Sequence, residues 1–137
     1  MKKVLVFTAL LLFAGIAFGQ TLKKGNLIGV HVVTVELKPD VTMEQYIKFL
    51  SEKYIPEFEK LYEGYHLFTM KGIRGENKGS IGFLFQLKDE ATRNLYNNDD
   101  GSPTDLGNQL WEKFKPVFSE MEKLGTWASD YTDWVIQ

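Results

Sequence analysis

The sequence contains no cysteine, and it has only two histidines and four prolines among its 137 residues. A chain without cysteine has no disulfide, no thiol nucleophile and no cysteine-based zinc site. The two histidines have no carboxylates near them in the sequence at a spacing typical of zinc ligands. We therefore predict a fold that is held together by packing alone, with no metal site and no bound cofactor.

One apolar run dominates the sequence, at residues 4–18, and it follows Lys2 and Lys3. It is shorter than the roughly 20 residues that a bilayer span needs. Ala17 and Gly19 then supply the small residues of a cleavage pattern before Gln20. The pattern predicts a signal peptide at 1–19 and an exported product, periplasmic or secreted, that is not membrane-bound after cleavage. An uncleaved anchor helix is the alternative.

Positive charge is not in excess in this chain. There are 16 Lys and Arg against 18 Asp and Glu, and loss of Lys2 and Lys3 with the signal peptide would change the formal charge from −2 to −4. A mildly acidic exported protein is a poor candidate for binding nucleic acid or an anionic membrane. The remaining length predicts one domain at 29–137, preceded by a short leader at 20–28.

Hydrophobic periodicity predicts the order strand, helix, strand, strand, helix, strand. The first helix, at 40–64, has a capping box formed by Thr42 and Gln45, and Pro56 should kink or break it. A short helix is predicted at 89–96, and the last long helix should be capped by Ser102 with Pro103 at its first position. The predicted strands are residues 29–39, the two strands flanking "RGENKG", and the final "TWASDYTDWVIQ".

This element order is that of an α+β, ferredoxin-like βαββαβ domain with a four-stranded antiparallel sheet. Right-handed crossovers place both helices on one face of the sheet. The other face would carry Val, Leu and aromatic side chains without cover, and such a surface is expected to be covered by a partner or a ligand, most commonly by a second copy of the sheet. We therefore predict a homodimer in which two sheets close into an α/β barrel.

The stretch "KGIRGENKGSIGF", residues 71–83, has four glycines and three cations. Its glycines fit neither the phosphate-binding loop pattern nor the dinucleotide-binding pattern, because a strand rather than a helix follows. Its resemblance to the aromatic strand of an RNA recognition motif is out of register. The glycines are best explained as the turn of a β-hairpin.

The element order over residues 29–137, with "YIPEFEKLYEGYHLF" leading into "KGIRGENKGSIGFLFQLKD", resembles the dimeric α/β-barrel superfamily. That group includes antibiotic-biosynthesis-type monooxygenases and NIPSNAP-like proteins. The resemblance implies a small hydrophobic substrate or haem between sheet and helices in the active members. No catalytic residue set carries over to this chain, and neither histidine falls on a predicted helix, where it could ligate haem.

The leading hypothesis is a domain without a catalytic site that binds a small apolar ligand, either between sheet and helices or inside the dimer barrel. The alternatives are a cofactor-independent monooxygenase or haem-handling enzyme of the same superfamily, and a purely structural interaction module. A histidine that faces the open side of the sheet would be the best acid–base group, because an unperturbed imidazole titrates near neutral pH. The residues predicted to line the pocket are His31, His66, Arg74, Trp127 and Tyr131.

Overall fold

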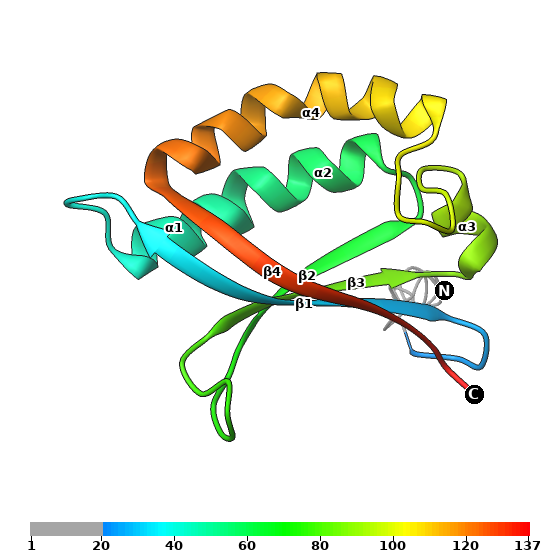
Figure 1. The fold of residues 1–137 in the computed structure, drawn as a ribbon, viewed down its shortest axis with the longest axis horizontal. Coiled ribbons are helices and arrows are strands. Elements are labelled where there is room, and N and C mark those ends of the chain that lie inside the picture. Colours follow the sequence, from blue (N-terminus) through cyan, green and yellow to red (C-terminus); the bar gives the residue numbers. More distant parts are fainter. Residues whose placement is uncertain (1–20) are drawn as a thin grey trace, which may run out of the picture.

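The structure, a computed structural model, describes residues 21–137, so the predicted signal peptide at 1–19 lies outside the described residues. In this part of the chain one antiparallel sheet has the strand order β2-β3-β1-β4, and Figure 1 shows the helices along a single face of it. This is the predicted ferredoxin-like βαββαβ fold. The elements in chain order are β1 (Leu27–Leu37), α1 (Met43–Phe49), η1 (Leu50–Tyr54), α2 (Ile55–Leu61), β2 (Tyr65–Lys71), β3 (Ile81–Leu87), α3 (Glu90–Asn94), α4 (Asp105–Leu124) and β4 (Gly125–Val135).

The first helical segment begins as predicted and is distorted in its middle. Thr42 is the N-cap, and the capping box with Gln45 is present. The segment then widens into one π-helical turn, η1, where the Ile55 N–H bonds the Leu50 carbonyl. Pro56 follows in the first turn of α2. A proline lacks the N–H that an α-helix requires and crowds the preceding turn, and a π-turn is one way to absorb that conflict.

The second helical region has a different start from the predicted one. The N-cap of α4 is Thr104, whose hydroxyl accepts from the Gly107 N–H. Ser102 instead bonds the Asp100 carboxylate in the preceding loop, so the predicted cap at Ser102 was wrong. Thr104 also satisfies the N-cap preference, and the loop geometry decides which of the two hydroxyls caps the helix.

The central strand β1 pairs with β3 on one side and with β4 on the other. It begins at Leu27, two residues before the predicted start. Because side chains alternate along a strand, the odd-numbered residues of β1 and β3 point toward the helices. Val33, Ile81 and Phe83 are accordingly buried in the core.

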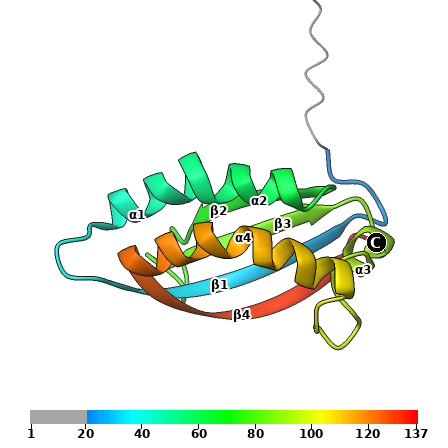
Figure 2. The same cartoon turned by 90° about the horizontal axis from the view of Figure 1, so that it is seen from above.

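One end of the layer between sheet and helices is densely filled. Tyr46 and Leu50 from the first helical segment, Phe114 and Met121 from α4, and Val33 from β1 are each at most 2% exposed. Figure 2 shows the first helical segment and α4 side by side over the strands. This packing fixes how the helices sit on the sheet and therefore what they enclose at the other end.

The opposite face of the sheet has no helix over it (Figure 1). The β2–β3 hairpin, residues 72–80, extends beyond the sheet on this side, as Figure 1 shows. Gly75 and Gly79 have positive φ, and a Cβ at Gly72 would lie 1.9 Å from the Asn77 carbonyl oxygen. The glycine-rich stretch is therefore a hairpin, as predicted. Within residues 21–137, no helix combines the length and the apolar character that crossing a bilayer requires.

Candidate functional site

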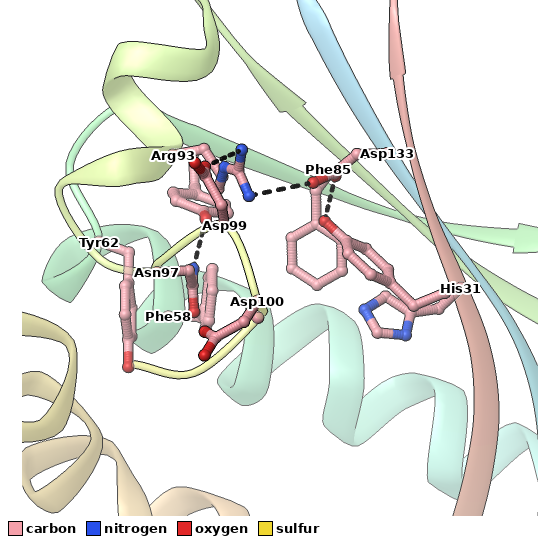
Figure 3. A pocket seen from close by; sticks show the side chains of 12 residues that line it. His31, Phe58, Tyr62, Phe85, Arg93, Asn97, Asp99, Asp100 and Asp133 are labelled. Atoms are coloured by element: carbon pink, nitrogen blue, oxygen red, sulfur yellow. Dashed lines mark hydrogen bonds and ion pairs between the residues drawn. The ribbon is translucent and has the colours of Figure 1, made fainter. Parts of the chain in front are cut away.

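A cavity of about 550 Å³ lies at the other end of the same layer, between the sheet, α2, α3 and the loop that precedes α4. Figure 3 shows Phe58 and Tyr62 on one side of it, Phe85 and His31 on the other, and Arg93 joined to Asp99 and Asp133. The cavity is within the size range of small-molecule sites. Its lining residues are His31, Phe58, Tyr62, Tyr65, Phe85, Arg93, Asn97, Asp99, Asp100, Gly101, Tyr131 and Asp133.

Gly29 on β1 makes room for one wall of the cavity. A Cβ at this position would lie 2.6 Å from the Tyr131 hydroxyl oxygen. Gly29 is paired with Asp133 of β4, two residues beyond Tyr131 and on the same face of the sheet. The missing side chain lets the Tyr131 ring lie across the strand, and its hydroxyl donates a hydrogen bond to Asp133.

A chain of charged groups closes one side of the cavity. Arg93 of α3 lies 3.9 Å from an Asp133 oxygen and 3.4 Å from an Asp99 oxygen. The Arg93 side chain is only 15% exposed, whereas that of Asp99 is 90% exposed. Arg93 is therefore held between a carboxylate on the sheet and another on the surface loop, and it ties α3 to β4.

His31 lies in the middle of the sheet wall. Its ring is 4.3 Å from that of Tyr131 and 5.1 Å from that of Phe85, measured between centroids. Its Nδ1 lies 2.9 Å from the Ser129 hydroxyl oxygen, while the ring lines the cavity. Burial lowers the pKa of His31, and the nearby Asp133 opposes this shift. The imidazole is therefore neutral at neutral pH.

The tyrosines of the cavity are held in their neutral form. Burial raises the pKa of Tyr65 to about 12, and the Asn97 amide donates to its hydroxyl at 3.2 Å. Burial and the hydrogen bond to Asp133 raise the pKa of Tyr131 as well. The tyrosine rings thus serve as uncharged, hydrogen-bonding walls.

The five residues predicted for a pocket do not come together. His31 and Tyr131 line the cavity, and Trp127 lies next to His31, with ring centroids 5.9 Å apart, without lining it. His66 is on the edge strand β2, 4.0 Å from a Glu59 oxygen, and Arg74 is exposed in the hairpin.

Several lining residues were missed by the sequence analysis. Asp133 is not among them, because the last strand already indicated it as a possible polar partner, two residues from Tyr131 and on the same face. Arg93 and Asn97 gave no such indication, since they belong to a short helix and a polar loop that only the tertiary fold brings over the sheet. Among the described residues no group of three or more His, Cys, Asp or Glu is placed to hold a metal ion.

Comparison with known proteins shows the fold. No family model matches the chain, and no curated protein matches it. A NIPSNAP family protein from Agrobacterium tumefaciens superposes with a TM-score of 0.52 at 9% identity, over 80% of this chain and 91% of that one.

Two further solved structures match at lower scores. A mutant of SnoaB, a cofactor-independent oxygenase from Streptomyces nogalater, matches with a TM-score of 0.46 at 14% identity, over 82% of this chain and 94% of that one. A dimeric protein of ferredoxin-like fold from Bacteroides fragilis matches with a TM-score of 0.45 at 8% identity, over 82% of this chain and 98% of that one. The chain is thus an α+β protein of ferredoxin-like fold, the fold that it shares with the NIPSNAP family protein.

Proposed function

We propose that this chain is an exported domain that binds a small, largely apolar ligand in the cavity between sheet and helices. The observation that carries the proposal is the cavity of about 550 Å³, walled by aromatic rings, at one end of a layer that is densely packed at the other. Protein interiors normally fill such space to crystal-like density. A roomy aromatic cavity with a few convergent polar groups is the usual form of a small-molecule site.

The binding test uses residues 20–137 and indole as a neutral aromatic probe, titrated by calorimetry. The variant Asn97→Phe places a ring at the cavity wall and should abolish binding. The control Phe68→Leu changes the uncovered face and should bind indole as the parent does, with circular dichroism confirming that both variants fold. Equal binding by Asn97→Phe and the parent, or no binding by any of them, contradicts the proposal.

We also propose that a second copy of the chain covers the bare face of the sheet. Apolar side chains from all four strands gather there, and Phe68, Trp134 and Val32 are 47%, 60% and 36% exposed. Leu84 is paired with both Phe68 and Val30, so these apolar side chains lie in one row. A monomeric protein rarely leaves such a patch in water. The residues of this patch are Val30, Val32, Phe68, Met70, Leu84 and Trp134.

Light scattering coupled to gel filtration tests the dimer. The parent should elute as a dimer, and Val32→Glu, which puts a charge in the centre of the patch, should elute as a monomer. Leu106→Glu is the matched control, because Leu106 is an exposed apolar residue on α4, away from this face. A parent that stays monomeric at high concentration overturns the dimer proposal and leaves the cavity proposal standing.

The same purified protein can distinguish ligand binding from the two alternative functions, a purely structural module and an enzyme. A purely structural module gains nothing from an unfilled cavity at the edge of its core, so the cavity favours a binding function over that alternative. A haem-handling enzyme would take up added haem and become coloured, and a cofactor-independent monooxygenase would consume oxygen with its substrate. We therefore place ligand binding first.

A further inference from the structure

The charge of the cavity indicates what kind of ligand it takes. We propose that the ligand is an organic cation, an amine or quaternary ammonium group attached to a compact apolar body. This inference rests on the proposed binding function and narrows its ligand class. Two independent features support it, the aromatic walls and the excess of carboxylates around them.

Five aromatic rings, from α2, the residue that follows it, β2, β3 and β4, form the apolar part of the wall. Phe58 lies 4.4 Å from Tyr62 and 5.6 Å from Tyr65, measured between ring centroids. Phe85 lies 5.9 Å from Tyr65 and 6.5 Å from Tyr131, so the rings form a continuous surface. The face of an aromatic ring attracts a cation that lies within about 6 Å of its centroid, and quaternary ammonium groups are typically bound in such cages.

The ionised groups at the cavity carry net negative charge. Among the described residues that line it, Arg93 is the only Lys or Arg, against the three carboxylates of Asp99, Asp100 and Asp133. Two of these carboxylates already contact the Arg93 guanidinium. His31 adds no positive charge at neutral pH, because burial lowers its pKa.

Asp100 is the carboxylate that Arg93 does not contact in the ion pairs of the described residues. It lies on the loop that borders the cavity, as Figure 3 shows. Hydrogen bonds from Ser102 lower the pKa of Asp100, so it is charged at neutral pH. An anionic ligand would have to enter against these charges, whereas a cation gains from both the carboxylates and the rings.

Three probes of nearly equal size separate the effect of charge from that of shape. They are benzyltrimethylammonium, its uncharged isostere neopentylbenzene, and phenylacetate, each titrated into residues 20–137 by NMR at low salt. We expect the cation to bind about tenfold more tightly than the isostere and phenylacetate to bind most weakly. The preference should shrink as salt is added.

Asp100→Asn tests the carboxylate directly, and Asp40→Asn is its matched control. Asp40 is in the turn before α1 at the far end of the sheet, and its positive φ suits Asn equally well. We expect Asp100→Asn to lose several-fold in affinity for the cation only, and Asp40→Asn to bind like the parent. Loss of binding by neopentylbenzene as well would mean that the variant had damaged the cavity, and would overturn the role given to Asp100.

The outcomes also separate this inference from the proposed function. If neopentylbenzene binds as tightly as the cation, or phenylacetate binds most tightly, the cation inference is overturned and the cavity remains a binding site. If no probe binds and indole does not bind either, both proposals are overturned; if indole alone binds, only the cation inference is overturned.

Discussion

The two ends of the layer between sheet and helices are built from the same elements but filled differently. Among the inward positions of β1, Val33 lies at the filled end, Gly29 and His31 lie at the cavity, and Leu27 beyond them is buried in a second cluster with Tyr62 and Tyr65. Val33 packs against Tyr46, Leu50 and other large side chains, whereas Gly29 leaves space that the Tyr131 ring partly occupies. Side chains therefore fill the layer less completely at the cavity, and functional sites commonly lie where a protein departs from its most stable packing.

The largest expected effect is at the filled end. Leu50 is 0% exposed, and Leu50→Ala should lower the free energy of unfolding by about 3 kcal/mol, because it removes buried apolar surface and leaves a void. Tyr131→Phe at the hollow end, which removes one hydroxyl, should cost about 1 kcal/mol or less. Urea denaturation of both variants measures the contrast, and equal losses would show that the two ends do not differ in packing.

The next largest loss of stability is expected at Gly29, where the Tyr131 ring leaves no room for a side chain. Gly29→Ala should lower the free energy of unfolding by about 1 to 3 kcal/mol, because the new methyl group displaces the Tyr131 ring. Near-ultraviolet circular dichroism should report the displaced ring. Gly101→Ala in the exposed loop is the control for backbone effects. The positive φ of Gly101 strains an alanine there, although no other atom lies within 4 Å of the added Cβ. A Gly29→Ala spectrum identical to that of the parent would contradict this account.

A smaller effect is expected from Asp133→Asn. This change removes the charged acceptor of Tyr131 and one partner of Arg93, and should lower the free energy of unfolding by about 1 kcal/mol. It should also lower the pKa of His31 further, because Asp133 is the group that opposes the effect of burial. NMR titration of the imidazole measures the shift, and an increase in the His31 pKa would refute the assignment.

The smallest expected effect is the contribution of His31 to the pH dependence of the free energy of unfolding. Its folded pKa is lowered below 6.5 by burial. Between the folded pKa and 6.5 the unfolded chain binds more protons than the folded chain does. The stability that neutral His31 contributes is therefore fully present above pH 6.5 and is lost as pH falls through the folded pKa. His31→Gln should therefore flatten the loss of stability between about pH 7 and about pH 5, measured by urea denaturation. His66→Gln on the edge strand is the matched control, and an unchanged slope in His31→Gln would exclude this role.

The fold could be predicted from the sequence because its evidence is local. The capping box at Thr42, the alternation from Ile81 to Leu87 and the glycines of the hairpin each fix a nearby piece of backbone. The errors were local choices between equivalent residues, as at Ser102 and Thr104, where two hydroxyls suited the same role. Pro56 indicated a distortion but not its form, which is a π-turn that buries Leu50 and Tyr54.

The candidate site could not be predicted in the same way, because its residues come from six helices and strands and from the loops that follow α2 and precede α4. The sequence placed His31 and Tyr131 on the first and last strands, and the structure shows that β1 and β4 pair with these residues opposite each other. Nothing local could place Arg93 over Asp133, 40 residues further along the chain, or show that Gly29 leaves room for a ring. The sequence alone determined the order of the elements and the two faces of each strand, because backbone periodicity is a local property. Only the tertiary structure decided which end of the layer is hollow, because a cavity is the space left when distant side chains meet.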